Sequence, residues 1–443
     1  MAELNLTEKL AHHKGKKVNP PLYWAMRNVV ARQQAAPMNL KVIDNVGMNK
    51  VKGQFLLMSN HTSRCDWQYI GMAVGGRHPM NFMASDVEFH RAHMHGIFDL
   101  MHVIPKKNFV NDYHCIKEIL SIVRQGGSVC FFPEGKSSIS GTNQPVMPGT
   151  GDLVKKLNIP VYTSTIRGGY MSNTQWNIAT RPGKVELYLN QPFTQEEIKN
   201  LSSEEIERRL NEVLWNDDFE WNKEARVRYK SNENVAVKLE EHLYLCPRCG
   251  AECRTRGEGN RFVCEACGNG MTIDEYYDLH PLDGTCVIPK NLRVWYELQR
   301  RAVYREIKNN PDFLLEDHVV IGHQPDDHYV DKHVTSEPIG EGMLRLTREG
   351  LSFTGTVNGQ PFELSSSATN TLSMVFETDS SNFGGFFKGK YYEFKPDRNS
   401  CTKWQIAVEE VHRAAGGRWK NTIPQQQWIY EDDKPDDREK YYL

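Results

Sequence analysis

Residues from about 40 to 192 alternate short apolar runs of strand length with stretches at helical spacing, and this alternation constrains the fold most. It is typical of an α/β domain in which helices cover a largely parallel sheet. The expected strands are Leu40–Ile43, Phe55–Ser59, Asn81–Ala84, Val103–Pro105, Ser128–Phe132, Val161–Ile166 and Val185–Leu189. The expected helices are Cys65–Ala73, Tyr113–Arg124 and Asp152–Leu157, with a charged helical segment at 202–228. An α/β domain with a mostly parallel sheet is therefore predicted for residues 40–230.

Four cysteines form a second constraint. Cys246-Pro-Arg-Cys249-Gly250 and Cys264-Glu-Ala-Cys267-Gly268 are two similar turns separated by fourteen residues. This spacing is typical of a four-cysteine zinc site. We predict a zinc ribbon over residues 240–275 in which Cys246, Cys249, Cys264 and Cys267 bind one structural Zn²⁺. Four thiolates leave no open position on the metal, so the zinc is not expected in an active site.

The rest of the chain after the cysteines divides into three expected parts. Residues 276–325 are predicted to be a helical linker. Residues 326–416 carry short alternating strands, a hairpin signal at Asn358-Gly359 and a closing helix at about Lys403–Ala415, which together resemble a pleckstrin-homology or GRAM-like β domain. Such a domain binds a lipid headgroup or a protein, or serves folding alone. The acidic tail, 417–443, is expected to be a solvated extension.

Charge and hydropathy narrow the class of protein. The formal net charge is −2, which argues against nucleic acid as a general partner, although arginines of the ribbon keep a nucleic-acid-binding ribbon as an alternative. No apolar run approaches the ~18 residues of a membrane-spanning helix. The first residues lack the apolar core of a signal peptide. A cytoplasmic location with peripheral membrane contact is expected.

The N-terminal region, 1–39, contains an expected amphipathic helix at 20–34. Two interpretations remain open. The apolar stripe packs on the domain behind it, or the helix lies at a membrane interface with Tyr23 and Trp24 at the level of the headgroups.

Polar residues follow two of the expected strands. His61 comes directly after the second strand, and of the sixteen histidines it alone has an aspartate, Asp66, five positions later. If His61 precedes the first helical turn, Asp66 can accept its ring N–H, as a general base requires. The second segment is Phe131-Phe132-Pro133-Glu134-Gly135-Lys136-Ser137-Ser138, a strand that runs into a glycine-containing loop able to hold an oxyanion or a phosphate.

Together these segments resemble the glycerolipid acyltransferase superfamily, the 1-acylglycerol-3-phosphate or lysophospholipid acyltransferases. Asn60, His61, Ser63 and Asp66 match its Asn-His-x-Ser-x-x-Asp block, and Phe132 to Gly135 with Ser138 match its Phe-Pro-Glu-Gly-x-x-Ser block. Residues 103–108 are similar to its basic block, and Ile159-Pro160-Val161 to its final block. The resemblance covers roughly residues 20–225.

The resemblance implies an O-acyltransferase of phospholipid metabolism. His61 would deprotonate a hydroxyl that attacks the thioester of acyl-CoA or acyl carrier protein, and Asp66 would orient His61. A lysophospholipid is the implied acceptor. The implied substrate-binding residues are Asn60, Ser63, Lys106, Lys107, Glu134, Gly135, Lys136, Ser138 and Arg167.

Two departures leave the acceptor open. Lysine stands at Lys106 and serine at Ser137 where the family carries arginine, whose planar fork binds phosphate more specifically than lysine does. A non-catalytic lipid-binding or scaffold protein of the same fold is therefore a further alternative.

Overall fold

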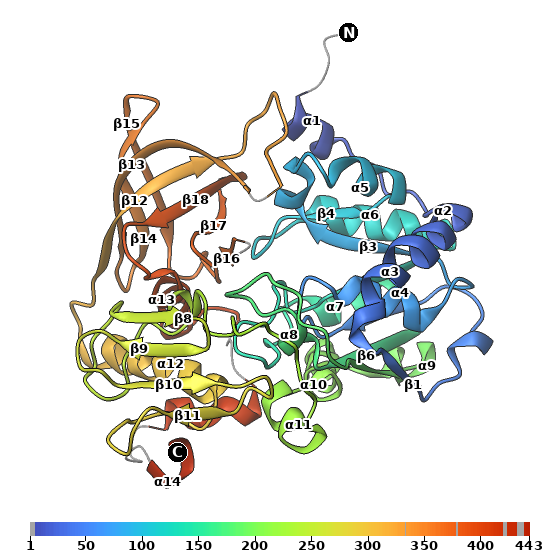
Figure 1. The fold of residues 1–443 in the computed structure, drawn as a ribbon. Helices are drawn as coiled ribbons and strands as arrows, with labels where there is room; N and C mark the ends of the chain where they lie inside the picture. Colours follow the sequence, from blue (N-terminus) through green and yellow to red (C-terminus); the bar gives the residue numbers. More distant parts are fainter. Residues whose placement is uncertain (1–4, 333, 378–379, 420–422, 432–437) are drawn as a thin grey trace.

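The computed structural model describes residues 5–332, 334–377, 380–419, 423–431 and 438–443. Three sheets follow one another along the chain, and two α-helices, α12 (Leu292–Asn309) and α13 (Cys401–Ala414), lie among the last two sheets (Figure 1). The remaining short elements are α1 (Leu6–Ala11), η2 (Ala36–Met38), η3 (Met48–Lys50), η4 (Asp86–His90), α8 (Gly169–Ser172), η5 (Leu239–Glu241), η6 (Pro424–Tyr430) and α14 (Arg438–Tyr441).

The first sheet has seven strands in the order β1-β7-β6-β2-β5-β3-β4. Its strands are β1 (Lys41–Asp44), β2 (Leu56–Ser59), β3 (Met80–Ser85), β4 (Ile104–Lys106), β5 (Ser128–Phe131), β6 (Val161–Arg167) and β7 (Glu186–Phe193). Every neighbouring pair is parallel except β6 and β7. The predicted α/β domain with a mostly parallel sheet is confirmed.

Helices bury both faces of this sheet, and successive strand residues point to opposite faces. Leu57 of β2 packs toward the N-terminal helices, α4 and α5, whereas Leu56 and Met58 pack toward the other helices. The first group is α2 (Pro20–Ala25), η1 (Met26–Ala31), α3 (Arg32–Ala35), α4 (Asp66–Val74) and α5 (His95–Met101). The second is α6 (Tyr113–Arg124), α7 (Thr150–Leu157), α9 (Gln195–Asn200) and α10 (Ser203–Leu214), and α11 (Asp218–Ala225) follows. Because both faces are covered, the central strands β2 and β5 are buried along their whole length.

The N-terminal helix packs on the domain and also presents apolar residues to solvent. Tyr23 is buried in the core, so its expected place at the level of membrane headgroups is wrong. Trp24 and Val29 are 59% and 64% exposed. The middle of this segment, η1, is a π-helix rather than an α-helix.

The cysteine module forms a four-stranded antiparallel sheet in the order β11-β10-β9-β8. Its strands are β8 (Thr255–Glu258), β9 (Arg261–Cys264), β10 (Gly270–Ile273) and β11 (Leu279–Pro281). Phe262 of β9 packs edge to face on Trp295 of α12. Helix α12 is therefore part of the core, and the predicted linker around it is wrong.

The third sheet is antiparallel throughout, in the order β15-β14-β13-β12-β18-β17-β16. Its strands are β12 (Leu315–His323), β13 (Glu337–Leu346), β14 (Gly350–Val357), β15 (Gln360–Ser367), β16 (Val375–Phe376), β17 (Phe383–Phe387) and β18 (Lys390–Pro396). The expected start at 326 is too late, because β12 pairs with both β13 and β18. The β-rich domain with a C-terminal helix is confirmed, while its likeness to a pleckstrin-homology or GRAM domain stays a prediction.

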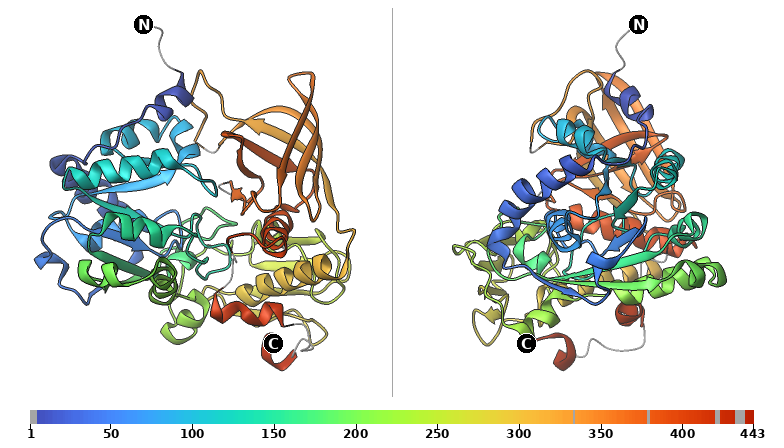
Figure 2. Two further views of the ribbon diagram at one scale, coloured as in Figure 1. Left: turned by 180° about the vertical axis from the view of Figure 1, so that it is seen from behind. Right: turned by 90° about the vertical axis from the view of Figure 1, so that its right-hand side faces the viewer.

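Helix α13 lies between the third sheet and the cysteine module in both views (Figures 1 and 2). Trp404 of α13 is fully buried and stacks on Phe383 of β17. One apolar core joins the module, α12, α13 and the third sheet, and it includes Ile139 and Trp176 from loops of the α/β domain. The two halves of the chain therefore share a core.

The tail is not the solvated extension expected from its composition. Trp419, Ile423 and Ile429 are buried, and η6 packs against α12. The acidic residues Asp432, Asp433, Asp436 and Asp437 lie outside the described residues.

Candidate active site

The two polar segments lie side by side at the carboxyl ends of two central strands of the first sheet. His61 follows β2, and the Pro133-Glu134-Gly135 loop follows β5. Strands β2 and β5 are neighbours and run parallel, so their carboxyl ends lie side by side. In open α/β sheets the crevice beyond these ends is where ligands bind.

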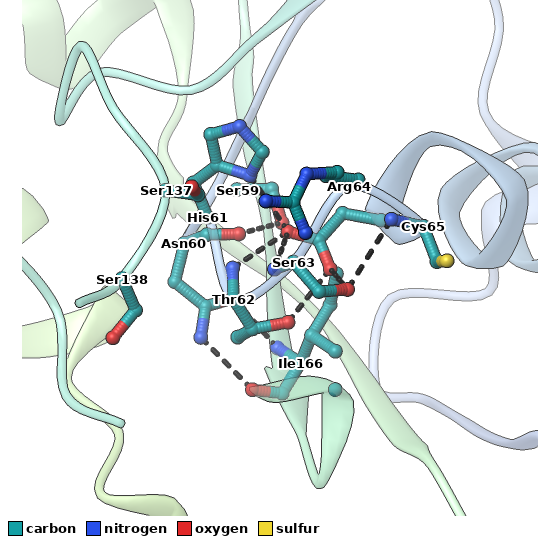
Figure 3. Close-up of polar contacts among 12 residues, drawn as sticks. Ser59, Asn60, His61, Thr62, Ser63, Arg64, Cys65, Ser137, Ser138 and Ile166 are labelled. Carbon is teal, nitrogen blue, oxygen red and sulfur yellow. Dashed lines mark hydrogen bonds and ion pairs between the residues drawn. The ribbon is translucent and has the colours of Figure 1, made fainter. Parts of the chain in front are cut away.

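His61 and Asp66 form a hydrogen-bonded pair, in which His61 Nδ1 donates to Asp66 Oδ2 at 2.8 Å. His61 lies in the turn before α4, and Asp66 is the first residue of that helix. The chain folds back between them, which overcomes the angular separation of five residues on a regular helix. Figure 3 shows this turn beneath the imidazole, with Ser137 and Ser138 on the neighbouring loop.

The carboxylate of Asp66 is fully buried and organises the whole turn. Besides His61 it accepts hydrogen bonds from the backbone N–H groups of Thr62 (2.6 Å) and Ser63 (3.0 Å) and from both hydroxyls. Ser63 lines the cavity described next, but its hydroxyl is engaged by Asp66. These donors fix the position of the carboxylate, which in turn orients the ring of His61 with Nδ1 as the donor.

His61 opens onto a cavity of about 770 Å³. Its ring stacks on Phe132 with 4.0 Å between centroids, and its side chain is 24% exposed. Because Nδ1 is taken by Asp66, the imidazole offers Nε2 to a bound molecule. The cavity continues between η1, α4, α5 and β3 along apolar residues that include Met26, Val30, Phe82, Met94, Phe98 and Met101.

Glu134 holds the backbone of His61 through a hydrogen bond. Its Oε1 accepts the backbone N–H of His61 at 2.8 Å, and its Oε2 accepts that of Gln144 at 2.6 Å. Burial raises the pKa of Glu134 to about 8, although the two N–H groups act to lower it. Glu134 does not line the cavity, whereas Gly135 does, with a φ of +77° that favours glycine.

Asn60 and Ser138 also connect parts of the site. The amide of Asn60 donates to the carbonyl of Ile166 (2.9 Å) and accepts its N–H (2.7 Å), which ties the end of β2 to β6. The backbone N–H of Ser138 donates to the carbonyl of His61 at 2.7 Å, and its hydroxyl donates to Thr142 within the loop. Neither side chain lines the cavity.

The four cationic side chains among the implied substrate-binding residues all contact other protein groups. They are Lys106, Lys107, Lys136 and Arg167. The ammonium of Lys106 donates to the carbonyls of Lys107 and Val110 and lies 3.9 Å from Asp112. Lys107 Nζ donates to the carbonyl of Gly389 in the third sheet at 3.3 Å. Arg167 lies over the ring of Tyr188, 4.7 Å from its centroid. Lys106 lines the cavity, but Lys107 and Arg167 do not.

The fourth cation, Lys136, joins the loop after β5 to α13. Its buried ammonium forms an ion pair with Glu409 and donates to Ser373 at 3.2 Å. Arg300 of α12 donates to the other oxygen of Glu409 at 2.6 Å. Burial alone would raise the pKa of Glu409, but the charges of Lys136 and Arg300 hold it down, at about 2.

Comparison with known proteins identifies the family of this domain. Residues 36–167, which contain both motifs, match the family model described as Acyltransferase. The chain carries an acyltransferase domain. A segment of 97 residues is 30% identical to 1-acyl-sn-glycerol-3-phosphate acyltransferase BAT2, chloroplastic, of Brassica napus, and covers 21% of this chain. It spans only 28% of that relative.

A solved structure is also similar. The 1-acyl-sn-glycerophosphate (LPA) acyltransferase PlsC of Thermotoga maritima aligns with 44% of this chain and 78% of its own, at 19% identity and a TM-score of 0.38. The family match of residues 36–167 and the segment 30% identical to the Brassica napus relative, rather than this structural likeness, confirm the superfamily suggested by the motifs for the N-terminal domain.

Cys246, Cys249, Cys264 and Cys267, outside the acyltransferase domain, form one cluster. Their Sγ atoms lie within 4.8 Å of one another, with Cys246–Cys267 at 3.7 Å and Cys249–Cys264 at 3.8 Å. A tetrahedral zinc with Zn–S bonds of about 2.3 Å requires S–S edges of about 3.8 Å. The cluster can therefore hold a metal of this kind.

Several residues at the site carried no signal in the sequence. Phe132 is recognisable in its motif but not as the platform beneath His61. Asn108 Nδ2 donates to the carbonyl of Gly135 at 2.6 Å. Val375, Phe376, Glu377 and Gln405 line the cavity from the C-terminal half. Only the folded chain brings such distant residues to the site.

No helix in the described part of the chain is both long and apolar enough to pass through a membrane.

Proposed function

We propose that the protein transfers a fatty acyl group from an acyl thioester to the hydroxyl of a lysophospholipid-like acceptor. His61 Nε2 removes the proton of the acceptor hydroxyl as its oxygen attacks the thioester carbonyl. The C–S bond then breaks, and the imidazolium returns the proton to the leaving thiolate. Asp66 keeps the imidazole in the required tautomer and stabilises the imidazolium while it carries the proton.

One observation carries this proposal: the His61–Asp66 pair opens onto a long, largely apolar cavity beside the Pro-Glu-Gly loop. The cavity volume of about 770 Å³ suits a lipid chain next to a reacting head. Glu134 and Asp66 hold the histidine from the side away from the cavity, so both serve the base rather than the acceptor. The pair needs no metal and no covalent acyl-enzyme for this reaction.

The acyl donor is acyl-CoA or an acyl carrier protein, and the acceptor is 1-acylglycerol-3-phosphate or a related lysolipid. The test is to incubate purified protein with each labelled donor and a set of lysolipids and to identify the product by mass spectrometry. A diacyl product formed with one donor supports the proposal. No product with any pair would favour the non-catalytic lipid-binding protein instead.

We further propose that the cysteine cluster binds one structural zinc ion. Four cysteine thiolates are ligands that zinc prefers, and the sulfur spacing fits a tetrahedral ion. The metal would hold the turns at both ends of the cluster and so stabilise the ribbon. None of the four cysteines lines the cavity, so the ion is assigned no part in the acyl transfer.

A third proposal concerns the N-terminal helix as a membrane contact. Trp24 and Val29 point outward, while Met26 and Val30 of the same helix line the cavity. Ile97 of α5 both lines the cavity and is 40% exposed. A bilayer at this surface would meet exposed apolar side chains beside the wall of the lipid cavity.

A further inference from the structure

The cavity beside His61 has two chemically different ends. The end under η1 and α5 is lined mostly by apolar side chains, as expected for an acyl chain, and the one arginine of η1, Arg27, donates to the carbonyls of Gly71 and Met72. The end beyond His61 carries the charged residues Arg64, Glu88 and Arg91 of the acyltransferase domain and Glu377 of the C-terminal half. An acceptor whose hydroxyl reaches His61 would place its head group among these charges.

The C-terminal half completes this polar end. Glu377 follows β16, and Gln405 lies on α13. Two contacts seat Glu377 against the acyltransferase domain: Arg91 Nη2 donates to its carboxylate at 3.3 Å, and Gln175 Nε2 donates to its backbone carbonyl at 3.4 Å. The head-group end is therefore built by both halves of the chain.

Two lysines that could bind a phosphate, Lys106 and Lys136, are already paired with other groups of the protein. Lys106 faces backbone carbonyls and Asp112, and Lys136 is paired with Glu409. Lys332 also lines the cavity, but it lies on an exposed loop where solvent screens its charge. None of these lysines supplies a desolvated, uncompensated charge.

Two carboxylates, those of Glu88 and Glu377, offset the positive charge at this end of the cavity. Arg91 lies between them, with Nη1 at 3.3 Å from Glu88 and Nη2 at 3.3 Å from Glu377. The side chain of Glu88 is 33% exposed on the cavity wall. Burial raises the pKa of Glu88, and Arg91 and Arg64 lower it. At this end of the cavity the guanidinium groups of Arg64 and Arg91 thus face the carboxylates of Glu88 and Glu377.

A phosphomonoester brings between one and a half and two negative charges at neutral pH. Buried charges are stable only with matching partners, so such a group would meet no surplus of positive charge here. A head group that carries one anion and one ammonium matches this arrangement of guanidinium groups beside carboxylates. Its anion would face the guanidinium groups, and its ammonium would face Glu88.

We propose that the polar end of the cavity is a head-group site for a zwitterionic lysolipid, with Glu88 as the residue that selects the ammonium. This inference rests on the proposed acyl transfer. It names an acceptor class different from the phosphomonoester on which the relatives act according to their names.

The test compares acceptors that share one acyl chain and differ in the head group. The set contains a phosphomonoester, a phosphoglycerol, a phosphoethanolamine and a lysolipid whose head group is an amino acid. We expect kcat/KM to be at least tenfold higher for the ammonium-bearing acceptors than for the phosphomonoester. The last two members distinguish a phosphate from a carboxylate as the anion.

The variant Glu88→Gln keeps the size of the side chain and removes its charge. It should lower the ratio of kcat/KM for phosphoethanolamine over phosphomonoester by about tenfold. Glu196→Gln, an exposed carboxylate on α9, is the matched control and should leave that ratio unchanged. A preference of the unmodified protein for the phosphomonoester, or an unchanged ratio in Glu88→Gln, would overturn the inference.

A binding measurement separates failure of this inference from failure of the proposed function. The same lysolipids, below their micellar concentrations, are added to the protein while its thermal unfolding is followed. A shift in Tm with the ammonium-bearing lipids that Glu88→Gln abolishes supports the site even without turnover. A shift with the phosphomonoester alone contradicts the site even if acyl transfer is observed.

Discussion

Glu134 accepts the backbone N–H of His61 at 2.8 Å, so the loop after β5 holds in place the residue that follows β2. This contact joins the two motifs through main chain rather than through a substrate. The resemblance to the family implied that Glu134 contacts the acceptor. In the folded protein its carboxylate is buried and does not line the cavity, so we propose that Glu134 is a positioning residue.

Glu134→Gln should lower kcat by about ten- to a hundredfold, because a small displacement of a catalytic group has effects of this size. The glutamine keeps one oxygen, which can accept the N–H of His61 or that of Gln144 but not both, and its NH2 group can accept neither. KM for the lysolipid should stay within about twofold, because Glu134 does not line the cavity. Steady-state kinetics check this, and a raised KM with unchanged kcat would instead make Glu134 an acceptor-binding residue.

The ion pair between Lys136 and Glu409 should make stability depend on pH. The pKa of Glu409 is held at about 2, below its ordinary value of 4.5, so the folded form stabilises the ionised carboxylate. The contribution of roughly 3 kcal/mol is complete above about pH 4.5 and is lost as the pH falls toward 2. Denaturant unfolding at several pH values measures it.

Glu409→Gln removes this titration and leaves Lys136 and Arg300 without their shared anion. The variant should be several kcal/mol less stable than the unmodified protein at pH 7, with a difference that narrows as the pH falls to 3. Glu196→Gln serves as the control with no such difference. If the Glu409→Gln difference were the same at both pH values, the pair would not be ionised in the folded protein.

Removing the metal ligands should destabilise the ribbon. Cys264→Ser should lose about one equivalent of zinc, measured by elemental analysis, and should lower the Tm. Cys286→Ser is the matched control, since this thiol is close in sequence but outside the cluster. Zinc retained in full by Cys264→Ser would show that this cysteine is not a ligand.

The exposed residues of the N-terminal helix should determine binding to membranes. Replacing both Trp24 and Val29 by serine should weaken binding to phospholipid vesicles by at least tenfold, since each loses the burial of a large apolar side chain. Leu314→Ser, which removes an exposed apolar residue beside β12, is the control. Vesicle flotation measures the bound fraction, and equal binding of all three proteins would place the contact elsewhere.

The first sheet could be predicted from sequence because its central strands, such as β2 and β5, are buried runs bounded by polar turns, whereas β1 at the edge of the sheet is mostly exposed. The His61–Asp66 pair could also be predicted from sequence, because both residues lie in one local turn and their spacing limits the geometry of the pair. The π-helical segment η1 gave no such signal. Its apolar stripe is compatible with either kind of helix.

Partners distant in sequence could not be predicted. Lys136 and Glu409 are 273 positions apart, and no local pattern indicates that a lysine beside the Pro-Glu-Gly loop is taken by a helix near the C-terminus. The polar and acidic composition of the tail predicts that Trp419 and Ile429 face solvent, whereas both are buried in the folded protein. The polar end of the cavity could not be predicted either, because Arg91 and Glu377 are also distant in sequence.

The role of His61 as the general base is tested most directly by the rate of acyl transfer of His61→Ala, measured with Asp66→Asn in parallel. We expect kcat to fall by at least a hundredfold in both variants, while the Tm and lysolipid binding of His61→Ala stay close to those of the unmodified protein. Full activity in a folded His61→Ala protein would contradict this role.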